Sequence, residues 1–278
     1  DSKDINNYMN RLGAAAKSAA GDLATVSSEV KNNALLYMSE ALDSRRNEIL
    51  LSNKVDLDKA KDKAIGDALI DRLELTDGRI DGMISGLKIV ASLPDPVGEI
   101  EEMKPTPSGL KISKMRVPLG VVGIIYESRP NVTADAAALC LKSGNACILR
   151  GGSEAILSNS LIADCLNQGL KRADLSENLI QVVNTTDREA VTALLRMEKF
   201  IDVIIPRGGK GLVRLISEEA RIPVIKHLDG ICHVYIDKDA DLDEAISIAF
   251  NAKTYRYGIC GAMETLLIHE EIATKILP

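Results

Sequence analysis

The sequence predicts an α/β protein whose parallel sheet is covered by helices on both faces. Continuous apolar segments, beginning with 121–126 and 146–150, alternate with helical patterns through the middle of the chain. Strands that are apolar on both faces are typical of a parallel sheet buried between two layers of helices. The chain has 278 residues, of which 46% are hydrophobic and 27% charged. That composition is enough to build one large domain or two smaller ones.

Helices are predicted for the N-terminal region, residues 1–93. Apolar side chains recur there at helical spacing in three stretches: 35–50, 69–73 and 80–91. Prolines at 94 and 96 end the region. Segment 98–117 then alternates polar and apolar residues around a Pro-rich and Gly-containing turn, which predicts a β-hairpin. Exposed hairpin edges pair readily with another chain, so we expect this hairpin to contribute to a homo-oligomer.

Strands and helices alternate from residue 118 onward. The expected strands are 121–126, 146–150, 179–183, 200–205 and 222–225. The expected helices between them are 134–142, 153–171, 187–197 and 211–219. The remaining pattern of strand, helix and strand after residue 228 predicts the beginning of a second α/β domain, too short to close a core alone. We therefore divide the chain into residues 1–228 and 229–278.

Charge and cysteine content exclude several classes of protein. A formal net charge of −6 argues against a nucleic-acid surface. The five cysteines have no CxxC spacing, which predicts free thiols in a reducing compartment, the cytoplasm. The three histidines have no metal-ligand spacing, and no apolar stretch approaches membrane-spanning length.

Cys260 is the candidate nucleophile. It follows Lys253 and Arg256, and glycines stand at 258 and 261. Neighbouring cations favour the reactive thiolate, and small residues let a substrate carbonyl approach it. A buried structural cysteine is the simpler interpretation of this residue taken alone. The loops upstream favour the catalytic one.

Two glycine-containing loops follow expected strands, where open α/β sheets bind ligands. The first contains Arg150, Gly151, Gly152 and Ser153, with Ser153 placed to cap the next helix. An ordinary strand–loop–helix turn explains one glycine pair more simply. The second loop, 206–211, has three glycines and two cations before a helix, which makes it the better anion site. Neither loop has the P-loop pattern, so the motifs give an NTPase no support.

A third candidate segment, 126–133, ends the first buried strand with Glu127, Ser128, Arg129 and Asn131. Arg129 has the geometry to hold a carboxylate or phosphate, and Ser128 or Asn131 to donate a hydrogen bond to an oxyanion. Capping of the following helix explains Asn131 or Thr133 equally well.

Together these segments resemble the γ-glutamyl phosphate reductases of the aldehyde dehydrogenase superfamily. The resemblance rests most specifically on Tyr-Glu-Ser-Arg-Pro-Asn at 126–131 and Ile-Pro-Arg-Gly-Gly at 205–209. Further matching stretches are 117–133, 141–153, 230–233 and 251–260. The resemblance implies a Rossmann-type cofactor-binding domain in 1–228 and the beginning of a catalytic domain in 229–278. Since members of this family continue well beyond residue 278, we expect residues 1–278 by themselves to be inactive.

The resemblance also implies an NADPH-dependent reduction of γ-glutamyl phosphate to glutamate 5-semialdehyde, in proline biosynthesis. Cys260 would form a thioacyl intermediate, with Ser128 and Asn131 near the oxyanion. The positions implied for substrate binding are Glu127, Arg129 and Arg256. The positions implied for the cofactor are Arg150, Gly151, Gly152, Ser153, Arg207, Gly208 and Gly209.

One absence supports this resemblance, one set of residues departs from the family pattern, and two alternatives stay open. Residues 226–230 contain no glutamate of the kind that hydrolytic aldehyde dehydrogenases use to activate water, which fits a phosphate-releasing enzyme. Tyr255, Tyr257 and Gly261 differ from the usual family residues and bear on substrate choice. The alternatives are a CoA-linked acylating aldehyde dehydrogenase, and a non-catalytic module that partners a glutamate kinase.

Overall fold

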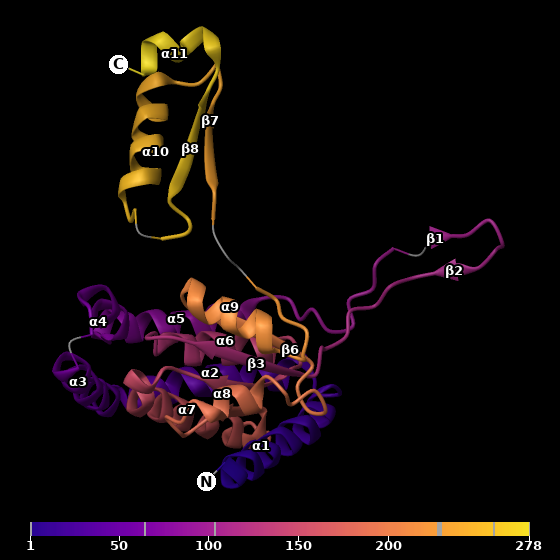
Figure 1. The fold of residues 1–278 in the computed structure, drawn as a ribbon. Coiled ribbons are helices and arrows are strands. Elements are labelled where there is room, and N and C mark those ends of the chain that lie inside the picture. Colours follow the sequence, from indigo (N-terminus) through magenta and orange to yellow (C-terminus); the bar gives the residue numbers. More distant parts are fainter. Residues whose placement is uncertain (1, 64, 103, 227–229, 258, 278) are drawn as a thin grey trace. The chain divides into compact units, whose positions relative to one another are not determined.

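Four parallel strands form the main sheet of the computed structural model, which describes residues 2–63, 65–102, 104–226, 230–257 and 259–277. The strands are β3 (Val121–Tyr126), β4 (Ala146–Arg150), β5 (Ile180–Val182) and β6 (Val203–Arg207). Every residue of β3 and β4 is buried, so both faces of the sheet are covered. The predicted α/β class is confirmed (Figure 1).

The strand order β5-β4-β3-β6 places the first of these strands inside the sheet. The chain moves from β3 to β4 and β5 on one side, and then returns to place β6 on the other side of β3. Strand order therefore reverses between β3 and β6. The carboxyl ends of the strands at such a reversal form the usual ligand-binding crevice of an open α/β sheet. Tyr126 and Arg207 are paired there.

Helices surround this sheet in more than one layer. The N-terminal ones are α1 (Ser2–Leu23), α2 (Ser28–Ser44), α3 (Arg46–Asp62), α4 (Asp67–Leu73) and α5 (Asp77–Ser92). Helix α1 contacts β3, β4 and β5, whereas α2 packs on α5, α6 (Asn131–Lys142) and α7 (Ile156–Arg172). Ser27 and Thr76 begin α2 and α5 by accepting the N–H groups of Val30 and Arg79. The predicted helical N-terminal region is thus present as five separate helices.

The predictions for the end of the sheet were partly wrong. Segment 222–225 forms only an isolated bridge between Val224 and Ile204, because Pro223 has no N–H with which to extend a ladder. Strand β6 begins at Val203 rather than at 200, since the N–H groups of Phe200 and Ile201 turn back to Met197 O. Helix α8 (Glu189–Leu194) is shorter than predicted, and α9 (Lys210–Glu219) follows β6 as expected.

The hairpin is present between residues 100 and 115. Strands β1 (Lys104–Pro105) and β2 (Lys111–Ile112) pair antiparallel, and a further bridge joins Ile100 to Met115. Leu110 and Ile112 are 64% and 54% exposed. Such apolar exposure fits a surface for another copy of the chain, and that contact stays a prediction.

The chain divides into two compact units, Asp1–Lys226 and His227–Pro278. The second unit contains β7 (Cys232–Ile236), α10 (Leu242–Thr254), β8 (Met263–Ile268) and α11 (Glu270–Ile276). Strands β7 and β8 pair in parallel, and a small cluster of buried side chains lies against them: Ile236, Ala245, Ala249 and Ile272. Alternate residues of both strands are exposed, so this unit buries one face of its sheet.

Asp56, on α3, holds the beginning of α7. One carboxylate oxygen accepts the N–H and the hydroxyl of Ser158, both at 2.8 Å, and the other accepts the N–H of Leu157 at 3.4 Å. Carboxylates stabilise a helix N-terminus because they pair its free N–H groups and oppose the helix dipole. The cap of α7 therefore comes from Asp56, and not from Ser153 as the sequence suggested.

We expect the stability that Asp56 contributes to fall as pH rises. Burial raises the pKa of the Asp56 carboxyl, and the hydrogen bonds from Ser158 and Leu157 oppose that shift. The folded state then keeps the proton in a pH range where the unfolded chain has lost it, which begins at about 4. Urea unfolding across this range should show wild type losing stability relative to Asp56→Asn, which does not titrate. Parallel pH profiles for the two proteins would contradict the prediction.

Candidate active site

Glu127 and Arg207 lie together where the strand order reverses. The N–H of Glu127, the residue after β3, donates to the carbonyl of Arg207 at 3.2 Å. Beyond Arg207, the chain enters α9 through Gly208 and Gly209. The sequence-predicted segments 126–133 and 206–211 are therefore brought to the same edge of the sheet.

The Glu127 carboxylate reaches the N-terminus of α9. Its Oε2 accepts the N–H of Gly209 at 2.9 Å. A Cβ added to Gly208 would lie only 2.6 Å from the same oxygen, so glycine leaves room for the carboxylate at this position. The sequence assigns Glu127 to the substrate, but its observed contact is with the loop expected to hold the cofactor.

Ser128 is a buried residue with a strained backbone. It is 4% exposed and has a φ of +43°, which is rare for a residue other than glycine. Both its N–H and its hydroxyl donate to Glu154 Oε1, at 2.8 and 2.6 Å. Because the hydroxyl proton is committed to Glu154, the geometry favours a positioning role for Ser128 over the oxyanion role expected from sequence.

A buried hydrogen-bond chain connects β3 to α6 and α7. Tyr126 Oη lies 2.7 Å from Thr133 Oγ1, and that hydroxyl donates to Asn159 Oδ1 at 3.1 Å. A Cβ on Gly151 would come within 2.1 Å of Asn159 Nδ2. This chain therefore fixes the first glycine loop. Sequence reasoning missed Asn159 and Glu154, whose only signal was their position shortly after the loop.

Arg150 ends β4 with its guanidinium buried. Only 7% of the residue is exposed, and Nη1 donates to the carbonyl of Gly151. Burial lowers the pKa of Arg150, while the negative charge of Glu154 opposes the shift. Among the residues that the structure describes, Arg150 Nε finds no acceptor. A buried donor of this kind fits a ligand that brings an oxygen, such as a ribose hydroxyl or a phosphate.

Gly152 and Ser153 complete this loop. A Cβ on Gly152 would lie 2.1 Å from Glu154 Oε1, so glycine leaves room for that carboxylate where it stands. Ser153 is exposed and begins a 3₁₀ turn that precedes α7. The loop thus offers an exposed hydroxyl beside a buried cation.

Asn131 and Arg129 occupy the turn before α6. The Asn131 side-chain amide donates to Asp135 Oδ2 at 2.9 Å, and its second N–H hydrogen is available for an oxyanion. Arg129 is half-buried. Helix α6 begins after Pro130 without a side-chain cap, so the capping interpretation of Asn131 and Thr133 is wrong.

Cys260 lies in the second unit, between α10 and β8, and is exposed. Its carbonyl accepts a hydrogen bond from Cys232 Sγ at 3.3 Å. A Cβ on Gly230 would lie 2.0 Å from the same carbonyl, so only glycine allows the two segments to pack. The thiol is thus carried on a loop held from its backbone side by Gly230 and Cys232.

Two cations, Lys253 and Arg256, were expected near Cys260 to favour its thiolate, and the structure only partly supports this expectation. Lys253 Nζ pairs with Glu264 Oε1 at 3.4 Å. Arg256 is exposed in the same loop, as are Tyr255 and Tyr257. The position at which hydrolytic aldehyde dehydrogenases carry their water-activating glutamate falls within 227–229, which lies outside the described residues.

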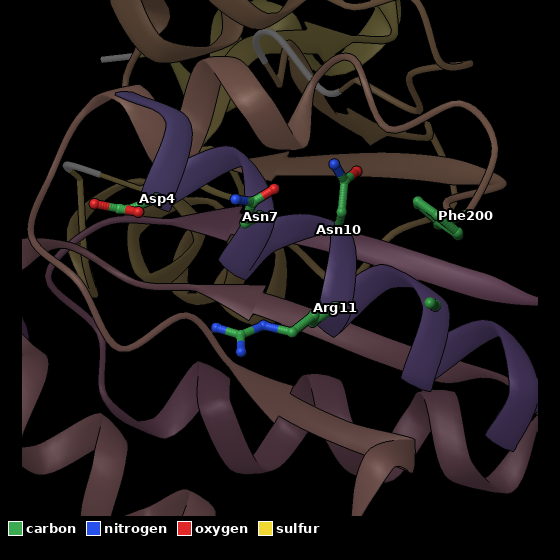
Figure 2. Close-up of a pocket in the computed structure, with 6 residues that line it drawn as sticks. Asp4, Asn7, Asn10, Arg11 and Phe200 are labelled. Carbon is green, nitrogen blue, oxygen red and sulfur yellow. The ribbon is translucent and has the colours of Figure 1, made fainter. Parts of the chain in front are cut away.

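A separate hollow lies along the first helix. Figure 2 shows a hollow along α1 that is lined by Asp4, Asn7, Asn10 and Arg11 of this helix and by Phe200. None of its lining residues is a sequence-predicted site residue. No cluster of three metal-ligating side chains occurs within the described ranges. None of the described helices combines the length and apolar character needed to cross a bilayer.

Residues 5–278 match the model of the aldehyde dehydrogenase family. The chain therefore belongs to the aldehyde dehydrogenase family, as its fold and its two glycine loops suggested.

Two solved structures place the similarity within that family. The γ-glutamyl phosphate reductase of Thermotoga maritima is 41% identical with a TM-score of 0.87, and the match covers 97% of this chain and 65% of that one. The γ-glutamyl phosphate reductase of Saccharomyces cerevisiae is 36% identical with a TM-score of 0.73, covering 97% of this chain and 68% of that one. The predicted resemblance is confirmed. This chain spans about two thirds of the length of both reductases.

A more distant structure shares the fold alone. The glyceraldehyde-3-phosphate dehydrogenase of Methanocaldococcus jannaschii, solved with NADP, is 19% identical with a TM-score of 0.64. That match covers 98% of this chain and 57% of the other.

Proposed function

We propose that this chain carries the cofactor loops and the nucleophile of an NADPH-dependent γ-glutamyl phosphate reductase. The products would be glutamate 5-semialdehyde and phosphate, and the reaction would serve proline biosynthesis. One observation carries the proposal, namely 41% and 36% identity to two such reductases across 97% of this chain. The exposed thiol of Cys260 is consistent with it.

Cys260 acts as the nucleophile in this proposal. Its thiolate attacks the acyl carbon of γ-glutamyl phosphate, and the bond from that carbon to the phosphate oxygen breaks. Phosphate leaves and a thioacyl group remains on Sγ. After reduction, the tetrahedral carbon expels the Cys260 thiolate, takes its double bond to oxygen and departs as the aldehyde.

The proposal also assigns charge and positioning roles to further residues of each unit. The backbone N–H of Cys260 would stabilise the oxyanion that forms when the thiol adds, and Asn131 is a side chain that the resemblance assigns to the same role. Arg129 and Arg256 would pair with the anionic groups of the substrate. Ser128, held by Glu154, would keep the turn that carries Arg129 and Asn131 in place.

The dinucleotide would be held by the loops of Arg150–Ser153 and Arg207–Gly209. A bound NADPH supplies the hydride. The unpaired Nε of Arg150 and the exposed hydroxyl of Ser153 favour an added 2′-phosphate, and therefore NADPH over NADH. The absence of a glutamate from 226–230 would protect the thioacyl group from water.

The reverse reaction tests this function. An enzyme containing these residues should reduce NADP⁺ in the presence of glutamate 5-semialdehyde only when phosphate is supplied, and more slowly with NAD⁺. Turnover that depends on CoA instead of phosphate would identify the CoA-linked alternative. If NADPH neither binds nor is oxidised, the chain is a non-catalytic module.

A further inference from the structure

The anion site at the beginning of α9 is already occupied by a side chain of the protein. Strands β3 and β6 are neighbours, and α9 follows β6 directly (Figure 1). Glu127 extends from the end of β3 to the N–H of Gly209, the N-cap residue of α9, where a helix N-terminus offers N–H groups to an anion. Its backbone is fixed by the hydrogen bond to Arg207, so the carboxylate begins close to this position.

The glycine at 208 is explained by the carboxylate itself. A Cβ there would be 2.6 Å from Glu127 Oε2 and 2.6 Å from the Leu212 side chain. The space that glycine leaves open, which sequence reasoning assigned to a phosphate, is filled by Glu127. A dinucleotide pyrophosphate at this loop would meet a like charge at contact distance.

The Glu127 carboxylate can also leave the N-terminus of α9. The residue is exposed, so its carboxylate can turn into water without a charge being buried. The contact itself is a single hydrogen bond at a helix N-terminus, an interaction that an arriving phosphate can replace.

We propose that Glu127 is an internal competitor for the pyrophosphate of the dinucleotide. It occupies the α9 N-terminus in the free protein and swings out when a phosphate binds. On release of the dinucleotide, the carboxylate returns to the Gly209 N–H. Glu127 therefore weakens dinucleotide binding and favours cofactor exchange. The inference rests on the proposed function, which assigns this loop to a dinucleotide.

Binding measurements on residues 1–278 with Glu127→Gln test the proposal. Glutamine has nearly the same shape and removes the charge. The control is Glu218→Gln, which removes an equal charge on the same helix, away from the loop, where Glu218 pairs with Arg214. Because the chain contains no tryptophan, the fluorescence of NADPH itself reports its binding. Inorganic pyrophosphate is titrated separately by calorimetry.

Glu127→Gln is expected to bind both NADPH and pyrophosphate roughly fivefold more tightly than wild type, the effect of one charge at contact distance in water. Glu218→Gln should match wild type. Equal or weaker binding of both ligands by Glu127→Gln overturns the proposal, since Glu127 would then be a bystander or a direct ligand. If pyrophosphate binds more tightly but NADPH binds to no variant, the competitor role stands and the proposed function fails. If NADPH binds to wild type and to Glu127→Gln with equal affinity, the proposed function stands and the competitor role of Glu127 fails.

Discussion

In an enzyme containing these residues, replacing Cys260 by serine is expected to lower turnover by at least about 10³-fold, because the loss of a covalent nucleophile removes the acyl-transfer route. A serine hydroxyl is a far weaker nucleophile than a thiolate unless a base activates it, and Lys253 in the same loop is paired with Glu264. The acyl adduct on the protein, read by intact-mass measurement after mixing with γ-glutamyl phosphate, should disappear together with phosphate release. NADPH affinity should be unchanged, because the cofactor loops lie in the first unit.

Cys232→Ser is the matched control. Cys232 lies beside the same loop and donates to the Cys260 carbonyl, and a serine hydroxyl can make the same bond. We expect turnover within a few-fold of wild type. An acyl adduct that persists in Cys260→Ser, or one lost in Cys232→Ser instead, would show that Cys260 is not the nucleophile.

The fold was predictable from sequence where a segment is buried on both faces. Strands β3 and β4 begin and end at the predicted residues, because an apolar run of 6 or 5 residues is too short for a typical helix and therefore indicates a buried strand. Segment 222–225 is equally apolar, but Pro223 limits it to one bridge. Helix α7 could be predicted from its periodicity, whereas its cap, Asp56, stands about a hundred residues earlier and leaves no local signal.

The sequence predicted which segments form the candidate site, but it did not predict which side chains in those segments contact one another. Both glycine loops follow strands, and the topology brings one of them beside Glu127 as the sequence order allows. The pairing of Ser128 with Glu154 was missed because it needs a positive φ at a non-glycine residue, which no pattern announces. Gly208 was assigned to a phosphate because a glycine loop before a helix is a usual anion site, whereas a Cβ there would meet the Glu127 carboxylate at 2.6 Å.

Gly169→Ala is expected to destabilise the protein by about 1–3 kcal/mol, the usual cost of overpacking a rigid contact. Gly169 lies on α7 where that helix packs on α2, and an added Cβ would be 2.5 Å from Met38 Cγ and 2.6 Å from the Met38 backbone nitrogen. A backbone atom in the middle of a helix cannot turn aside. Helices α2 and α7 must therefore separate, and α7 carries the Arg150–Ser153 loop at its beginning, so NADPH affinity should fall with stability.

Gly21→Ala provides the matched comparison, because Gly21 is also near the end of a helix and has nothing within 4 Å of an added Cβ. Both substitutions gain the same helix propensity, which stabilises by about 0.5–1 kcal/mol. We expect Gly21→Ala to raise the free energy of unfolding by that amount, so the difference between the two variants isolates the contact with Met38. Urea unfolding at one pH gives both values. If Gly169→Ala is as stable as Gly21→Ala, the close approach of α2 to α7 is wrong, since a methyl group at that position always adds propensity and only a clash can reverse its sign.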